Sequence, residues 1–326
     1  MTPVTTERGP RPTTAGTVRS GGRTPRRTVD PRTPKRTARR VERRWAMLFA
    51  TPYLAHLALL TAWPLLALAY LGFTDYDTVS SPRWTGLDNY ARLLGDEAFW
   101  TSMLNTGYFA LIFVPLQTVV ALALAVGLNQ KLRGIPLLRG AYFVPVVSSW
   151  VVMAYVADAV FNPRLGSANT VLDWFGIDPQ NWLDSPVLVI PTLALIAVWK
   201  GAGYMMVLFL AALQAIPEER YEAARVDGAG AWGRFRHITV PGVSGTTFLV
   251  LVLSTITTLQ AFEQVFVMTG GGPGDSSELT VLYMYRQGFE YFQMGYAAAI
   301  AWVLFAVILL LTLVQLRLQK RWVHYA

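Results

Sequence analysis

Long apolar segments alternate with polar segments along the chain, and this alternation is its most regular feature. A helix rises about 1.5 Å per residue, so each apolar segment is long enough to cross a hydrocarbon layer of about 30 Å. The pattern predicts an all-α polytopic membrane protein with six transmembrane helices. The predicted spans are residues 45–73, 107–129, 141–161, 187–216, 242–268 and 296–316.

The polar segments suggest how the chain is organised. Residues 1–44 are rich in Arg, Thr, Pro and Gly and poor in large aliphatic side chains, so we expect a disordered basic tail. Residues 45–104 hold the first span and an outer segment, and residues 105–316 hold a core of five further spans interrupted by the polar segment 217–241. Residues 317–326 form a short polar end. A basic arm beside a bilayer is explained by anionic lipid, so no nucleic-acid partner is expected.

The distribution of Lys and Arg predicts the orientation of the spans. Most of the 28 Lys and Arg residues lie in the tail, the loop 130–140, the segment 217–241 and the end after residue 316. The three loops on the opposite side hold only Arg83, Arg92, Arg164 and Arg286. Positively charged loops stay on the cytoplasmic side of a membrane. Both termini and the segment 217–241 are therefore expected in the cytoplasm, with the chain in the cell membrane.

Composition supports a membrane protein and argues against several kinds of chemistry. The 326 residues are 53% hydrophobic and 15% charged, whereas a soluble chain carries roughly 25% charged residues. There is no cysteine, and His56, His237 and His324 show no metal-ligand spacing. The run TGGGPGDS at 269–276 lacks the lysine of a phosphate-binding loop. We therefore expect no enzyme activity, metal or cofactor on this chain, and any ATP and Mg²⁺ would be used by another subunit.

The segment 217–241 contains the stretch YEAARVDGAGAWGRFRHITVP. Pro217 suits the first position of a helix, and Gly228 lets the backbone leave it. A second amphipathic piece follows at 232–238. The segment therefore predicts a helix, a glycine turn and a second helix along the membrane surface. From the residues alone, it is either a linker resting on lipid headgroups or a low-profile surface for another protein.

This stretch resembles the EAA signature of binding-protein-dependent ABC importer permeases. Only Val240, where leucine is usual, departs from that pattern. The resemblance extends to the carbohydrate-uptake branch, through Thr85–Tyr90, Trp199-Lys200 and the run Met268–Pro273. Only the tail finds no counterpart. The matching positions are Glu222, Ala223, Ala224, Asp227, Gly228, Ala229, Phe235, Ile238 and Pro241.

The resemblance implies a type I ABC importer permease fold, with residues 105–316 as the transmembrane permease core. The segment 217–241 would be the coupling segment, in which Glu222 pairs with a basic residue of an ATPase subunit. The implied partners are a second homologous permease, two ATP-binding subunits and an extracytoplasmic solute-binding protein. The solute would be a sugar, with glycerol-3-phosphate or another non-sugar solute as the alternative. An ion-coupled secondary transporter is a rival that needs an acidic residue at mid-membrane.

A few polar residues fall within the predicted spans. Lys200 lies too deep for its stem to reach water, so it must face an ion-pair partner, a carbonyl or a watery cavity. It is either part of a structural ion pair or part of the translocation path, and Gly203 nearby would permit close helix approach. Glu263 and Asp158 fit interfacial positions as well as functional ones. The candidate path residues are Lys200, Tyr204, Gln260 and Glu263, with Trp150 and Trp199 as further rings against which a sugar can stack.

Overall fold

The computed structural model describes residues 36–130, 132–320 and 323. It divides into two compact units, one ending at Leu60 and the other beginning at Thr61. In the first unit, helix α1 (Arg36–His56) continues into the π-helical η1 (Leu57–Ala62). The predicted disordered tail therefore ends too late: residues 36–44 are helical because Arg, Ala and Glu favour a helix. Residues 1–35 lie outside the described part of the chain.

The second unit is helical apart from one short antiparallel pair of strands, β1 (Thr74–Asp75) and β2 (Arg83–Trp84). Its longer helices are α4 (Glu97–Leu128), α5 (Ile135–Val147), α6 (Trp150–Phe161), α8 (Val189–Ala215), α12 (Ser244–Leu259) and α15 (Met294–Gln319). Shorter helices are α2 (Trp63–Leu71), α3 (Asp88–Leu94), α7 (Ser167–Asp173), α9 (Glu218–Val226), α10 (Ala231–Arg234), η2 (Phe235–Thr239), α11 (Val240–Gly242), α13 (Glu263–Met268), α14 (Thr280–Tyr285) and η3 (Arg286–Glu290).

The predicted membrane spans are recovered in part. Within the described residues, four helices are long and apolar enough to cross a membrane, at 44–71, α4, α8 and α15. Two further pairs of helices qualify only if each bent pair is one span, which gives four to six spans. The helical, multi-pass architecture predicted from the sequence is confirmed. α4 begins at Glu97, ten residues before the predicted boundary at 107, because Asp96 caps its first turn.

The predicted third span, 141–161, is not one continuous helix. α5 and α6 are bent by 107° at Ser148 and Ser149, which both adopt extended backbone. The Ser149 side chain accepts a hydrogen bond from the Val152 amide (3.3 Å) and caps α6. The apolar run therefore holds the end of one helix and the start of another.

The predicted fifth span, 242–268, is also broken. α12 ends at Leu259, and α13 begins at Glu263 after a short non-helical stretch that contains Gln260. At its other end, α12 is bent by 64° from the helical stretch 231–242.

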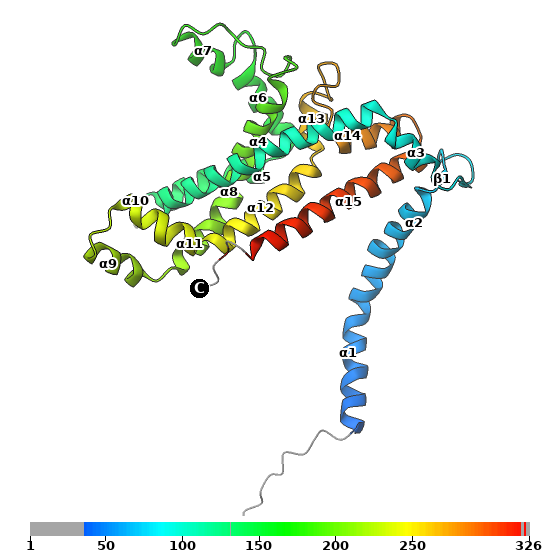
Figure 1. Cartoon of the computed structure of the whole chain (residues 1–326), viewed down its shortest axis with the longest axis horizontal. Coiled ribbons are helices and arrows are strands. Elements are labelled where there is room, and N and C mark those ends of the chain that lie inside the picture. The colour runs from blue at the N-terminus through cyan, green and yellow to red at the C-terminus, as the bar shows by residue number, and fades with distance from the viewer. Residues whose placement is uncertain (1–35, 131, 321–322, 324–326) are drawn as a thin grey trace, which may run out of the picture. The chain divides into compact units, whose positions relative to one another are not determined.

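Helix α8 is the centre of the second unit. It packs against α4, α5 and α12, and 61% of its most apolar window is buried inside the protein (Figure 1). Gly203 lies where α5 crosses α8, and a Cβ there would overlap the Tyr142 carbonyl. The close helix approach expected at Gly203 is confirmed. The segment with α9 and α10 lies at one end of this bundle, and α3 and α14 lie toward the other (Figure 1).

Asp96 ties three helices together at the end of the bundle that carries α3. Its Oδ1 accepts hydrogen bonds from the amides of Ala98 (3.0 Å) and Phe99 (3.3 Å), and its Oδ2 accepts them from the hydroxyls of Tyr283 (2.5 Å) and Tyr296. Burial of Asp96 opposes its ionisation, but these hydrogen bonds outweigh burial and lower the pKa of the carboxyl. The ionised carboxylate therefore joins α4 to α14 and α15.

We predict that Asp96→Asn destabilises the protein by about 1–3 kcal/mol at pH 7, because a charged acceptor of four hydrogen bonds is lost. A lowered pKa contributes stability above the unfolded value of about 3.9, and that stability is lost as the pH falls through the folded value. The wild type should therefore approach the variant only below about pH 4. Denaturant unfolding in lipid nanodiscs checks this, with Asp88→Asn, an exposed acid in α3, as control. Equal stability of wild type and Asp96→Asn at pH 7 would contradict it.

Candidate functional site

A cavity of about 670 Å³ lies among α4, α8, α12 and the residues that flank the two helix breaks. All four residues predicted for the translocation path, Lys200, Tyr204, Gln260 and Glu263, line it. Trp150, at the start of α6, lines it too. The structure thus brings together residues that are more than one hundred positions apart in sequence. It does so because both broken helices turn irregular backbone toward α8.

Lys200 is held by backbone carbonyls. Its Nζ donates to the carbonyl oxygens of Pro145 (3.2 Å), Val146 (3.2 Å) and Ser148 (2.8 Å), at the C-terminal end of α5. An ammonium group has three donor protons, so these contacts use its hydrogen-bonding capacity fully. The cation also complements the negative end of the α5 dipole. The structural ion pair suggested by the sequence is not formed among the described residues, because carbonyl oxygens take the place of a carboxylate.

Trp150 lies beside the same ammonium group. The Lys200 Nζ is 5.2 Å from the centre of the Trp150 ring, within range of a cation–π interaction. Lys200 thereby fixes both the elbow between α5 and α6 and an aromatic ring in the cavity wall. Lys200 therefore supports the fold through carbonyls rather than an ion pair, and its part in a translocation path stays a prediction to which its place in the cavity wall is relevant.

The remaining polar candidates divide between this cavity and other places. Glu263 begins α13 and lines the cavity, so an interfacial position alone does not describe it. Trp199 does not line it and instead borders a separate apolar hollow between α6 and α8. The stacking role considered for Trp199 is therefore wrong for this cavity. Asp158 accepts a weak hydrogen bond from Asn162 (3.4 Å) at the end of α6.

Several buried polar residues of the cavity wall were not singled out from the sequence, among them Gln117, Ser254, Thr258 and Gln264. Gln117 of α4 and Ser254 of α12 both line the cavity. Both are polar residues inside predicted spans, which is the signal that would have drawn attention to them.

The segment 217–241 has the helix, glycine turn and second helix that its sequence predicts. Gly228 has a φ of +77° and follows the C-cap residue Asp227. The Ala229 amide donates to the Ala224 carbonyl (2.8 Å), and the Gly228 amide donates to the Arg225 carbonyl (3.1 Å). This pair of bonds is a Schellman motif, which needs a left-handed residue at the position of Gly228. The turn therefore has one defined geometry.

Helix α9 presents an open surface. None of its residues is buried, and Glu222 and Ala223 are exposed while Ala224 is half-buried. Glu222 forms no hydrogen bond or ion pair with another described residue. An exposed carboxylate followed by two small side chains is thus accessible to a basic partner.

The two ends of the segment are fastened to each other. The Tyr221 hydroxyl lies 3.0 Å from Thr239 Oγ1, which joins α9 to η2. Ile216 Cδ1 lies 2.6 Å from the place that a Cβ on Gly242 would occupy, so the C-cap of α8 and the end of α11 meet closely where the segment begins and ends. Among the predicted residues, Phe235, Ile238 and Pro241 are half-buried in this second arm. The segment can therefore move as a unit with the ends of α8 and α12.

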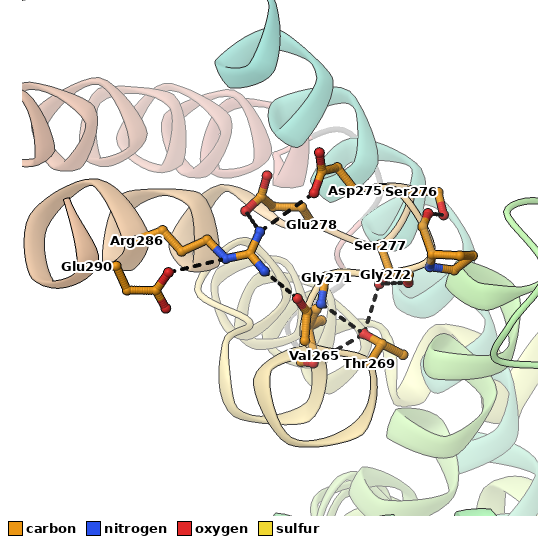
Figure 2. Close-up of polar contacts among 12 residues, drawn as sticks. Val265, Thr269, Gly271, Gly272, Asp275, Ser276, Ser277, Glu278, Arg286 and Glu290 are labelled. Carbon is orange, nitrogen blue, oxygen red and sulfur yellow. Dashed lines mark hydrogen bonds and ion pairs between the residues drawn. The ribbon is translucent and has the colours of Figure 1, made fainter.

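The glycine-rich run after α13 forms a tight turn. Gly270, Gly271 and Gly274 all have positive φ. Arg286 holds the turn: its Nη1 lies 2.5 Å from Glu278 Oε1, and its Nη2 donates to the Gly270 carbonyl (2.5 Å) (Figure 2). Burial raises the pKa of Glu278, although the Arg286 guanidinium opposes this. The turn is therefore anchored to η3 by a largely buried ion pair.

The neighbours of Arg286 extend the network. Arg286 also lies 3.6 Å from Asp275 and 3.9 Å from Glu290, and Thr269 Oγ1 is 2.8 Å from Ser277 Oγ (Figure 2). On the other side of the turn, Asn105 of α4 donates to the Asp275 and Glu278 carbonyls (both 3.1 Å). The turn thus connects α4, α13 and η3.

These features define a multi-pass membrane protein with a cavity between broken helices and an exposed surface helix between two of its spans. Residues 34–324 match the family of the binding-protein-dependent transport system inner membrane component. The chain belongs to this family. Its members are transport components rather than enzymes, in agreement with the expectation from the sequence.

Several relatives are similar over most of their length. A probable ABC transporter permease protein of Bacillus subtilis, YesP, is 36% identical over 85% of this chain and 91% of its own. The lactose transport permease LacF of Rhizobium radiobacter is 34% identical over 82% and 91%. The trehalose/maltose permease MalF of Thermococcus litoralis is 33% identical over 76% and 83%.

A solved structure has the same fold. A chain of a bacterial ABC transporter involved in the import of the acidic polysaccharide alginate superposes with a TM-score of 0.76. It is 24% identical, and the match covers 88% of this chain and 99% of the other. The type I ABC importer permease fold implied by the sequence is confirmed.

We predict that Lys200→Met lowers the stability of the protein by more than 2 kcal/mol, an amount typical of breaking charged hydrogen bonds to buried groups. The Val146 and Ser148 carbonyls would lose the ammonium donor in a region where water is scarce, while the Pro145 carbonyl would keep its bond from the Ser148 amide (3.3 Å). Thermal unfolding in nanodiscs measures the effect. Tyr204→Phe is the matched control, since it also alters a cavity residue of α8. A Lys200→Met variant as stable as Tyr204→Phe would show that the carbonyl contacts contribute little.

We also predict that Gly228→Ala destabilises the turn after α9 by about 1–2 kcal/mol, because an L-residue must adopt positive φ. No atom lies within 4 Å of the added Cβ, so the effect arises from the backbone alone. Hydrogen exchange of the amides at 228 and 229 should become faster. Gly230→Ala, which has negative φ and open space, serves as control. Unchanged exchange in Gly228→Ala would contradict the assigned turn.

Proposed function

We propose that this chain is a permease subunit of an ATP-driven ABC importer and forms, with a second homologous permease, the translocation path for a sugar. The observation that supports this best is the cavity at the level of two broken helices, in a chain of the transport family. Relatives named for lactose and for trehalose/maltose transport support a sugar over glycerol-3-phosphate. Family membership also removes the reason to invoke an ion-coupled transporter.

The chemistry of the cavity suits a sugar. Trp150 and Tyr204 supply aromatic rings, and Gln260 supplies an amide that both donates and accepts hydrogen bonds. Sugars combine hydroxyl groups with apolar C–H faces, so a cavity that mixes amides and rings matches both. Ligand sites in proteins commonly combine an apolar lining with a few placed polar groups. Lys200, through its hold on the α5–α6 elbow, keeps one of these rings in place.

In the proposed assembly, α9 is the coupling helix and is received by an ATPase subunit in the cytoplasm. Glu222 pairs with a basic residue of that subunit, and Ala223 and Ala224 allow close approach. Two ATP-binding subunits bind ATP and Mg²⁺ and carry out hydrolysis, so this chain binds no cofactor. An extracytoplasmic binding protein delivers the solute; such a protein accompanies the alginate transporter in a second solved structure.

The contacts within the chain support a transmission path. α9 continues α8 beyond Pro217, and α12 leaves the segment beside Ile216. α8 lines the cavity with residues near its middle, and α12 lines it with residues of its last two turns. A displacement of the segment by the ATPase is therefore carried to two walls of the cavity as a rigid-body movement.

We predict that Glu222→Ala lowers ATP-dependent uptake, and the stimulation of ATPase activity by loaded binding protein, about 10-fold or more. Glu222 is an exposed carboxylate of the matching motif and is followed by two alanines. The transporter reconstituted in liposomes with its partner subunits gives both readouts. Glu219→Ala, an exposed acid of the same helix outside the motif, should behave as wild type.

Two results would contradict this prediction. Uptake that continues without any ATPase subunit and follows an ion gradient would overturn the proposed function. Equal loss of activity in Glu222→Ala and Glu219→Ala would overturn the specific role of Glu222. Membrane insertion of both variants, checked by extraction and size-exclusion chromatography, separates these outcomes from a failure to fold.

A further inference from the structure

Gln117 and Ser254 are buried polar residues without partners in the wall of the cavity. Both side chains are 0% exposed. Neither amide atom of Gln117 nor the Ser254 hydroxyl has a hydrogen-bond partner among the described residues. A buried polar group without a partner costs roughly 1–3 kcal/mol. Eight buried side-chain atoms of the described residues lack a partner, and three of them belong to these two residues of one cavity wall.

The packing around Gln117 holds its amide in place. Its Nε2 and Oε1 lie 3.3 and 3.4 Å from the position that a Cβ on Gly201 would occupy. The glycine therefore makes room for the amide between α4 and α8, one residue after Lys200. Ser254 reaches the same cavity from α12. Polar groups on two different helices thus converge on one space.

The formal charges of the cavity wall cancel, and its ammonium group already has hydrogen-bond partners. Lys200 and Glu263 are the charged residues among those that line it, so their formal charges cancel. The three protons of the Lys200 ammonium are directed to the carbonyls of α5. An anionic solute would therefore meet the Glu263 carboxylate, and it would find the Lys200 ammonium with no proton left to donate. The other polar lining groups, such as Gln260, Gln264 and Thr257, are uncharged.

From these observations we propose that Gln117 and Ser254 form a hydrogen-bonding subsite for the hydroxyl groups of an uncharged saccharide, and that the cavity discriminates against acidic sugars. This inference rests on the proposed function and deepens it by naming the class of sugar. The Gln117 amide donates through Nε2 and accepts through Oε1, which matches a pair of neighbouring hydroxyls. Ser254 Oγ contributes a donor and acceptor for a further hydroxyl.

Desolvation makes the subsite selective. A site whose buried polar groups are left unpaired by the wrong ligand discriminates far more strongly than an apolar pocket. Hydroxyl groups of a neutral sugar satisfy Gln117 and Ser254, whereas a carboxylate would be brought into a low-dielectric space beside Glu263 without a free cation.

The test is direct binding of sugars to the permease–ATPase complex in nanodiscs, without the binding protein, whose own selectivity would mask that of the cavity. The probes are a neutral glucose trisaccharide and a uronate trisaccharide, followed by saturation-transfer NMR. Wild type should bind the neutral probe at least about 10-fold more tightly. Gln117→Met should weaken neutral binding about 10- to 100-fold, and Ser254→Ala about 3- to 10-fold.

Controls separate the subsite from a general effect on the fold. Gln287→Met changes another buried glutamine that does not line the cavity, and it should bind as wild type. Ser254→Ala removes one oxygen atom only, so it remains informative if Gln117→Met fails to fold. Equal binding of the neutral probe by wild type and Ser254→Ala, or by wild type and a folded Gln117→Met, would overturn the proposal.

A parallel assay distinguishes this inference from the proposed function. ATP-dependent uptake is measured with the complete transporter, including its binding protein. One outcome would overturn the subsite and leave the importer function standing: the wild type takes up the uronate probe and binds it as tightly as the neutral probe. Absence of ATP-dependent uptake for every saccharide tested would overturn both.

Discussion

This structure depends on one constraint: backbone carbonyls inside a bilayer need hydrogen-bond donors from the protein itself. Where α5 ends at Val147, the helix can no longer satisfy its last carbonyls, and little water is available to do so. Lys200 donates to the Val146 and Ser148 carbonyls, and to that of Pro145, which also accepts from the Ser148 amide. The bend of 107° between α5 and α6 is tolerable because of that one side chain. The bend in turn brings Trp150 to the cavity and gives the cavity a polar wall.

Helix α8 links this constraint to the rest of the molecule. Its middle holds Lys200 and, at Gly203, admits α5 to backbone contact. Its end at Ala215 leads directly into the segment 217–241, whose return at Gly242 touches the residue after α8. The cavity and the exposed α9 are therefore two ends of one rigid path. In an importer, that path lets a movement at the surface alter the shape of the cavity.

The sequence predicted the features that depend on local pattern. α8 and α15 follow from apolar runs bounded by polar residues, and the turn at Gly228 follows from a glycine placed after a helical stretch. The break at Ser148 could not be predicted, because two small serines leave the apolar run looking continuous. The partners of Lys200 were equally hidden, since backbone carbonyls have no sequence signature. Gln117 lies in an apolar helix whose sequence alone does not reveal that its amide faces α8.

The most direct test of the account is whether the cavity opens to alternate sides of the membrane. The chain contains no cysteine, so Thr257→Cys places a single thiol of this subunit in the cavity. Its labelling by a membrane-impermeant reagent is measured from each side, with a cysteine-free partner complex, in the nucleotide-free state and with a non-hydrolysable ATP analogue. The account predicts labelling from the side of α9 without nucleotide and from the opposite side with it. Labelling from the same side in both states would contradict it.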